Sequence, residues 1–274
     1  MKTENDKIAV PLLVASDMGG TLIRGSQGVP DFTASVLNQL ANNGVPVALI
    51  TGYNYFTTLR YTRNLNEKIL LLPQNGTLCI KKKALVWEYR IPEASAKELY
   101  GYLEEKLLPV IIYKGQAEDF GNFYVHYEDV PALADAFKRL NHLDNFENIT
   151  GISTLLPDET ALKVRTDIER LIGNTFKVIY VRESKGSWLE VVHAEVRKDL
   201  ALKRLCLELD IPLSRVVYFG DNFNDREVLR LVGHPVLVDN AMPELKEEFS
   251  HIVPSVYEEG VAIYLKKLFQ LNVE

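Results

Sequence analysis

The chain has 274 residues, of which 47% are hydrophobic and 25% charged, and its formal net charge is −6. This balance predicts a soluble globular protein with enough core for one large domain or two. The negative charge, without any long Lys/Arg block, argues against nucleic acid or an anionic membrane as a partner. The only cysteines, Cys79 and Cys206, lie far apart, which argues against a disulfide framework or a cysteine-based zinc site. No apolar run reaches the length of a membrane-spanning helix, and we expect a cytoplasmic protein.

The N-terminal part alternates between strand and helix patterns. An apolar run at residues 8–15 predicts a buried parallel strand. A helical repeat of apolar residues from Phe32 to Leu40, a stop at Gly44 and a second apolar run at 45–50 complete a β-α-β unit. The next elements expected are a helix at 54–65, a strand at 69–72, a turn at 74–76 and hairpin arms at 78–80 and 85–89.

The pattern becomes mixed between about residues 91 and 189. Helices are expected at 94–107, 130–140 and 158–172, and strands at 110–113, 123–127 and 177–181. Such a mixture is typical of an α+β insertion and not of a continued parallel sheet.

The alternation then resumes. Helices are expected at 198–209, 225–232, 242–249 and 258–269, and strands at 215–219 and 235–238. The predicted fold class is therefore α/β: a Rossmann-like doubly wound parallel sheet formed by residues 1–90 and 190–274, with a smaller α+β domain inserted at 91–189.

Carboxylates follow two of the predicted strands. Asp17 comes after the first strand, and Asp221 and Asp225 follow the strand at 215–219. Because open α/β sheets place ligands at the carboxyl ends of their strands, these three groups are expected to converge. Their repulsion calls for a hard cation, and oxygen ligands favour Mg²⁺ over zinc. The simpler alternatives are that Asp17 opens a Gly-Gly turn and that Asn224 caps a helix.

Two further features are weak when taken alone. Thr51 and Gly52 lie between a strand and a helix, where a hydroxyl and free backbone N–H groups can bind phosphate. An ordinary turn capped by Thr51 is the alternative. Lys198 begins a predicted helix, where the helix dipole disfavours a cation unless it has an anionic partner. The alternative for Lys198 is an exposed lysine.

Together these motifs have a recognisable order. D-x-G-G-T at 17–21, T-G at 51–52, Lys198 and G-D-x-x-N-D at 220–225 resemble the haloacid dehalogenase superfamily of phosphohydrolases. The long insertion, with the motifs at 74–77, 239–244 and 259–262, resembles its Cof-type branch, in which an α/β cap is inserted. The resemblance covers most of the core and little of the cap.

The resemblance implies a role for each matching residue. Asp17 would be the nucleophile that forms an aspartyl-phosphate, and Lys198 would act with it. The resemblance also implies Mg²⁺ ligated by Asp17, Asp221 and the backbone carbonyl of Gly19. Thr51, the N–H of Gly52, Lys198 and Asn224 would hold the phosphoryl oxygens, and Asp225 would support Lys198 or metal-bound water. The implied substrate is a small phosphorylated metabolite such as a sugar phosphate.

Two positions depart from the family pattern. Gly19 stands where the family has a second aspartate, which protonates the leaving alcohol and later activates water. Its loss removes acid–base help worth about 10²–10⁴-fold. Three explanations are open: an engineered Asp→Gly change, a natural protein that uses another base, and a phosphate-binding protein without turnover. Tyr53 stands where Cof-type proteins often carry arginine, which would alter substrate contacts.

The predicted function is thus Mg²⁺-dependent hydrolysis of a phosphate monoester. The alternatives are a non-catalytic or impaired phosphometabolite-binding protein and a phosphotransferase in which a second sugar replaces water. The candidate substrate contacts from the insertion or its junction are His126, Arg165, Trp188, Glu190 and His193. The simpler alternative for each is a structural or solvent-facing residue.

Overall fold

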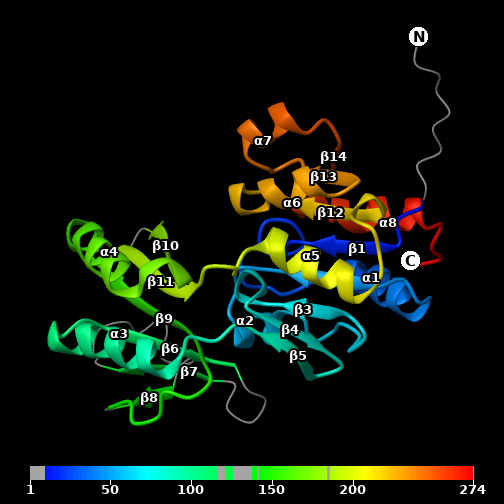
Figure 1. Ribbon diagram of the computed structural model, residues 1–274. Helices are drawn as coiled ribbons and strands as arrows, with labels where there is room; N and C mark the ends of the chain where they lie inside the picture. Colours follow the sequence, from blue (N-terminus) through cyan, green and yellow to red (C-terminus); the bar gives the residue numbers. More distant parts are fainter. Residues whose placement is uncertain (1–9, 116–120, 126–137, 141, 184–185, 274) are drawn as a thin grey trace.

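The computed structural model describes residues 10–115, 121–125, 138–140, 142–183 and 186–273. Within these ranges the chain forms two sheets (Figure 1). One has eight strands and is built from both ends of the chain, and the other has six strands from the middle. This arrangement confirms the predicted α/β core with a separate, smaller sheet, which we call the cap.

The core sheet has the order β14-β13-β12-β1-β2-β3-β4-β5. Its strands are β1 (Leu13–Ser16), β2 (Val47–Ile50), β3 (Leu70–Leu72), β4 (Leu78–Lys81), β5 (Ala84–Glu88), β12 (Val216–Gly220), β13 (His234–Val238) and β14 (Ile252–Val253). The strands from β14 to β3 pair in parallel, and β4 and β5 continue as an antiparallel hairpin. Strand β1 lies in the middle, between β2 and β12.

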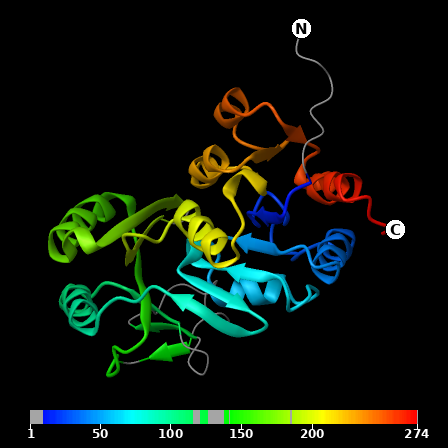
Figure 2. The same ribbon diagram turned by 45° about the vertical axis from the view of Figure 1, so that its right-hand side comes forward.

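Helices cover both faces of the core sheet, because its strands are apolar on both sides. Figure 2 shows α1 (Asp31–Asn42) and α8 (Gly260–Leu268) on one side of the sheet and α5 (Lys198–Glu208), α6 (Arg226–Leu231) and α7 (Pro243–Glu248) on the other. The short helix α2 (Tyr55–Tyr61) follows β2, and its Tyr61 packs on the α1 side. No described helix is both long and apolar enough to cross a membrane.

The cap sheet has the order β10-β11-β9-β6-β7-β8, and only β7 and β8 pair in parallel. Its strands are β6 (Val110–Lys114), β7 (Gly121–Val125), β8 (Lys138–Leu140), β9 (Ile149–Leu156), β10 (Phe176–Glu183) and β11 (Gly186–His193). Helices α3 (Glu93–Glu105) and α4 (Asp158–Ile172) pack on one face through apolar residues. Side chains of the other face reach a cleft shared with the core.

Several predicted elements differ in the structure. The first strand begins at Leu13, and the residues before it, Val10 and Leu12, are 49% and 43% exposed. Residues 8 and 9 of the predicted strand lie outside the described residues. Residues 138–140 form strand β8 beside β7, so the end of the helix expected at 130–140 is wrong. The rest of that helix, residues 130–137, lies outside the described residues. Strands β9, β11 and β14 were not expected.

The turn expected at 74–76 and the hairpin with arms at 78–80 and 85–89 are confirmed. Gln74–Gly76 forms a short 3-10 turn that leads from β3 into β4, with positive φ angles at Gln74 and Asn75. The turn between β4 and β5 is at Lys82 and Lys83, whose φ angles are 50° and 63°. A pair of residues with positive φ is what a two-residue hairpin turn requires, and both lysines are exposed.

Candidate active site

Three neighbouring parallel strands bring the predicted residues to one edge of the core sheet. Asp17 directly follows β1, Thr51 follows β2, and Asp221 follows β12. The backbone N–H of Asp17 donates to the carbonyl of Phe219 at 2.9 Å, which continues the pairing of β1 with β12 beyond the strand. The expected convergence of these segments is therefore present.

The loop after β1 is held tightly against the loop after β12. Thr21 Oγ1 donates to Asp221 Oδ1 at 2.7 Å. Gly20 has a φ of +81°, and a Cβ placed there would lie 2.4 Å from Asp221 Oδ2. The loop therefore needs a glycine at position 20, both for its backbone angle and for the close approach of the Asp221 carboxylate.

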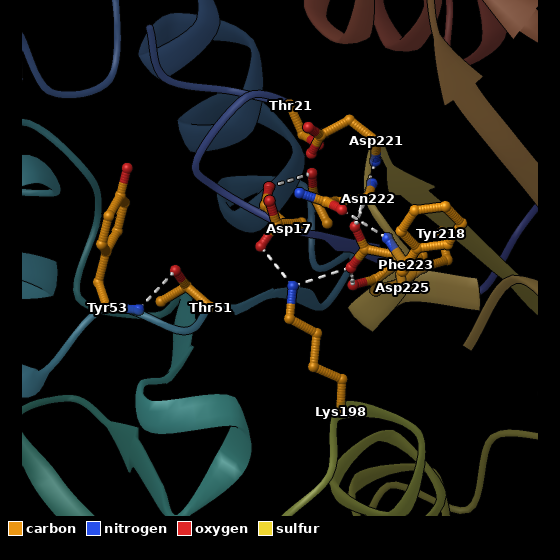
Figure 3. Close-up of polar contacts among 11 residues, drawn as sticks. Asp17, Thr21, Thr51, Tyr53, Lys198, Tyr218, Asp221, Asn222, Phe223 and Asp225 are labelled. Carbon is orange, nitrogen blue, oxygen red and sulfur yellow. Dashed lines mark hydrogen bonds and ion pairs between the residues drawn. The ribbon is translucent and has the colours of Figure 1, made fainter. Parts of the chain in front are cut away.

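Lys198 reaches the site from the start of helix α5. Its side chain is buried, and its Nζ lies 2.5 Å from Asp17 Oδ1 and 2.8 Å from Asp225 Oδ1 (Figure 3). The anionic partners that a lysine at a helix N-terminus needs are thus Asp17 and Asp225. The alternative of an exposed lysine is wrong.

Asp225 is fully buried and accepts hydrogen bonds on both oxygens. Its Oδ1 accepts from Lys198 and, at 2.7 Å, from the hydroxyl of Tyr218. Its Oδ2 accepts from the backbone N–H groups of Asp221 and Asn222, each at 3.2 Å. Asp225 ends a short 3-10 turn, Phe223–Asp225, whose N-cap is Asn222. The alternative in which Asn224 is the cap is therefore wrong.

The site holds more negative than positive charge. Burial raises the pKa of Asp17 to about 7, and the neighbouring Asp225 and Asp221 add to this effect while Lys198 opposes it. The pKa of Asp221 is also raised, chiefly by burial. Burial works to lower the pKa of Lys198, but the charges of Asp17 and Asp225 outweigh it and raise that pKa. Among these four side chains, three carboxylates face one ammonium group.

This acidic cluster fits a divalent cation. Asp17, Asp221 and Asp225 each offer a carboxylate oxygen, and these oxygens lie within 4.8 Å of one another. An excess of two negative charges in a mostly buried site is relieved by one doubly charged cation or by protons. Because Asp225 is already bonded to four donors, Asp17 and Asp221 are the carboxylates that remain for a cation. Gly19 lies in the loop that follows β1, in a backbone bridge with Ile23.

A cleft between core and cap contains the predicted phosphate-binding residues. It is lined by Gly52, Asn75, Lys198 and Asn224 from the core and by Ile179 and Glu190 from the cap. Thr51 is buried beside it, and its Oγ1 accepts from the N–H of Tyr53 at 3.1 Å. The cap of helix α2 is Asn54, which accepts from Thr57 N–H at 2.9 Å, so the alternative in which Thr51 caps the helix is wrong.

The cleft continues toward the cap sheet. Its walls there are Tyr53 and Gln74 from the core and Tyr113, Ser153, Trp188 and Glu190 from strands β6, β9 and β11. Burial raises the pKa of Glu190 to about 7, against the opposing effects of Gln74 and Lys177. Sequence patterns pointed to Trp188 and Glu190 but missed Tyr113 and Ser153, which carry no motif. Gln74 belongs to the motif at 74–77 but was not predicted to line the cleft.

The other cap candidates have different surroundings. Arg165 pairs with Glu169 one turn along helix α4, at 2.7 Å. His193, at the end of β11, stacks on Tyr89 with ring centroids 5.2 Å apart. His126 lies outside the described residues.

Tyr53 and Gly19 meet in a way that sequence patterns did not predict. A Cβ added to Gly19 would lie 2.6 Å from the Tyr53 hydroxyl oxygen and 3.0 Å from Cζ of its ring. Figure 3 shows Tyr53 on the side of Asp17 opposite to Asp221 and Asp225. Burial raises the pKa of the Tyr53 phenol, and the nearby Tyr61 and Asp17 add to the shift. The space of a side chain at position 19 is therefore taken by Tyr53.

Comparison with known proteins points to one family. The family described as haloacid dehalogenase-like hydrolase matches residues 14–265. The HMP-PP phosphatase of Yersinia enterocolitica is 27% identical, over 93% of this chain and 94% of its own. The 5-amino-6-(5-phospho-D-ribitylamino)uracil phosphatase YitU of Bacillus subtilis is 24% identical, over 95% and 98%. A haloacid dehalogenase-like hydrolase from Bacteroides thetaiotaomicron has the same fold, with a TM-score of 0.79, 19% identity and coverage of 94% and 99%.

Proposed function

Because this chain belongs to the family of haloacid dehalogenase-like hydrolases, we propose that it is a Mg²⁺-dependent phosphatase of small phosphorylated metabolites that uses Asp17 as its nucleophile. The observation that carries the proposal is the buried Asp17 carboxylate, held by Lys198 at the carboxyl edge of the sheet. The two curated relatives support the substrate class, since both names are those of phosphatases acting on phosphorylated compounds.

The phosphate group of the substrate would enter the cleft next to Asp17. The Thr51 hydroxyl can donate to a phosphoryl oxygen while it accepts from the Tyr53 N–H. The N–H of Gly52, the Lys198 ammonium and the Asn224 amide supply further donors, and Gly52, Lys198 and Asn224 line the cleft together. These groups would hold the negative charge of the transferring phosphoryl group.

The reaction would then proceed in two displacements. An oxygen of Asp17 forms a bond to phosphorus while the bond from phosphorus to the alcohol oxygen breaks, which gives an aspartyl-phosphate and an alkoxide that must take up a proton to become the alcohol. Water next attacks phosphorus and displaces the Asp17 carboxylate, which releases phosphate. Lys198 keeps the Asp17 carboxylate in place, and Asp225 orients Lys198 through the 2.8 Å contact.

Mg²⁺ would be held by the carboxylates of Asp17 and Asp221 and by the backbone carbonyl of Gly19. The donor set supports this assignment, because it consists of oxygens and carries an excess of negative charge. When bound, the ion supplies positive charge that stabilises the phosphoryl oxygens.

A second candidate function is a phosphometabolite-binding protein without turnover. The observation that favours it is Gly19, which has no side chain to exchange protons with the leaving alcohol or with water. Binding requires only the donors around the phosphate, whereas turnover also requires these proton transfers.

Phosphate release from an aryl phosphate separates the two functions, because an aryl leaving group needs little protonation. We expect Mg²⁺-dependent release by the unaltered chain and loss to background in Asp17→Asn. Asp144→Asn, at an exposed carboxylate of the cap, is the matched control and should leave the rate unchanged. If the unaltered chain binds inorganic phosphate but releases none from the substrate, it is the binding protein. Release that is unaffected by Asp17→Asn contradicts the proposed nucleophile.

A further inference from the structure

We propose that the Tyr53 hydroxyl donates a proton to the leaving-group oxygen and later regains one from the attacking water. Its ring and hydroxyl occupy the space that a side chain at position 19 would otherwise fill. The inference rests on the proposed phosphatase function. It starts from a chemical need, because the alcohol of an alkyl phosphate leaves as a strongly basic alkoxide unless a nearby group protonates it.

The hydroxyl of Tyr53 lies about as far from the Cβ position of residue 19 as an aspartate oxygen would. A Cβ built on Gly19 lies 2.6 Å from Tyr53 Oη. In an aspartate, ordinary bond lengths put each carboxylate oxygen about 2.4 Å from Cβ. Tyr53 therefore brings an oxygen to the distance from the Cβ position at which a carboxylate of residue 19 would hold one.

Three of the other hydroxyl and ammonium groups around Asp17 already donate to carboxylates, and the Ser16 hydroxyl donates to the backbone carbonyl of Asp17. Lys198 contacts Asp17 and Asp225, Thr21 donates to Asp221, and Tyr218 donates to Asp225. Among the residues that the structure describes, the Tyr53 hydroxyl has no such acceptor, and Tyr53 lines the cleft that faces the cap. An ordinary phenol keeps its proton at neutral pH and can donate it.

Tyr53 is held by contacts on both its backbone and its ring. Its N–H donates to Thr51 Oγ1 at 3.1 Å, and its carbonyl accepts from the N–H of Gln74 at 2.8 Å. Its ring packs edge-on against Tyr61, with centroids 5.4 Å apart. These contacts fix the direction of the phenol, and a proton donor that is oriented in advance is more effective than a mobile one.

The proton balance closes over the two displacements. In the first, the phenol O–H bond breaks as the P–O bond to the alcohol breaks, and the proton forms the O–H bond of the released alcohol. Tyr53 is left as a phenolate. In the second, the phenolate takes a proton from the water that attacks phosphorus, which restores the phenol. Asp17 is released as a carboxylate, and no other reactant is needed.

Tyr53→Phe tests the assignment, because it removes the hydroxyl and keeps the ring. Rates should be measured with Mg²⁺ on an aryl phosphate and on an alkyl phosphate of similar size. We expect a loss of about 10²–10⁴-fold on the alkyl phosphate and less than about tenfold on the aryl phosphate. Tyr61→Phe, which removes a hydroxyl from the neighbouring ring, is the control and should behave like the unaltered chain.

The possible results distinguish this inference from the proposed function. Equal losses on both substrates indicate a packing role and overturn the inference, and so does an unchanged alkyl rate. If the unaltered chain cleaves only the aryl phosphate, it has no effective acid, and the inference is again overturned while the phosphatase function stands. If it cleaves neither, both proposals fail.

A second variant checks the same space. Gly19→Asp alone has to displace the Tyr53 ring, whereas Gly19→Asp with Tyr53→Ala gives the new carboxylate room. We expect the double variant to cleave the alkyl phosphate faster than Tyr53→Ala alone. An equal or lower rate in the double variant contradicts the claim that the two side chains serve the same position.

Discussion

The Lys198 ammonium lies 2.5 Å from Asp17 Oδ1 and joins two segments that are 181 residues apart in the chain. Removing the cation leaves Asp17 and the fully buried Asp225 without a positive partner. Breaking a buried ion pair from one side costs about 3–5 kcal/mol. We expect Lys198→Met to lower the free energy of unfolding by about that amount and to reduce phosphate release to near background. Urea unfolding and rate measurements check this.

Lys203→Met is the control for this substitution, because Lys203 lies on the same helix α5 but has no contact with the acidic cluster in the part of the chain that the structure describes. Its stability and rate should stay close to those of the unaltered chain. A Lys198→Met variant that keeps its rate within about tenfold would remove Lys198 from the proposed machinery.

Gly20 provides a test of the loop that holds Asp221. Gly20→Ala and Gly25→Ala both place a side chain at a positive φ, +81° and +58°, and each should cost about 1–2 kcal/mol of stability for that reason. Only at Gly20 does the new Cβ meet a neighbour, since it would lie 2.4 Å from Asp221 Oδ2, whereas at Gly25 nothing lies within 4 Å. We therefore expect Gly20→Ala alone to lower the rate and to raise the Mg²⁺ concentration needed for half-maximal activity. Equal Mg²⁺ dependence in the two variants would contradict a metal-binding role for Asp221.

Glu190 should make stability depend on pH. Its pKa is ordinarily near 4.5 and is raised by burial to about 7 in the folded chain. Between these two values the folded state keeps a proton that the unfolded state has released, so the stability that Glu190 contributes is lost as pH rises through this window. Glu190→Gln removes the effect. We therefore subtract the free energy of unfolding of the unaltered chain from that of the variant. This difference should increase between about pH 5 and about pH 8, by at most about 3 kcal/mol.

Urea unfolding at several pH values measures this difference. Glu159→Gln, at an exposed glutamate on helix α4, is the control and should give a difference that does not vary with pH. A flat difference for Glu190→Gln as well would show that the Glu190 carboxylate is solvated in the folded chain.

The sequence predicted the part of the site that depends on strand order. Asp17, Thr51 and Asp221 each follow an apolar run, and the parallel pairing of β2, β1 and β12 brings such residues to one edge. The helix dipole predicted only that Lys198 has an anionic partner, because it indicates a need for charge but not which residue meets it. Asp225 was predicted as a support for Lys198 only by the family resemblance.

Prediction failed where polar residues are buried or where a contact is purely tertiary. Strand β9 carries Thr150, Ser153 and Thr154, all buried, so its sequence lacks the apolar alternation by which strands are recognised. The meeting of Gly19 with Tyr53 joins two loops, and neither residue belongs to a periodic pattern. Such contacts become visible only when the loops have been placed in space.

Asp225 gives the most demanding test of the buried network. Four groups donate hydrogen bonds to its side chain, two to each oxygen, so both oxygens must be acceptors. Asp225→Asn would turn one acceptor into an amide N–H that faces other donors. We expect it to lower the free energy of unfolding by about 3–5 kcal/mol and to abolish phosphate release, since Lys198 loses its orientation.

Tyr218→Phe removes one donor and leaves the Asp225 carboxylate intact, so it should lower the free energy of unfolding by only about 1.5–3 kcal/mol and preserve most of the rate. Urea unfolding and single-turnover rates measure both variants. If Tyr218→Phe abolishes the rate while stability falls no further than this, the Tyr218 hydroxyl takes part in the reaction and not only in holding Asp225.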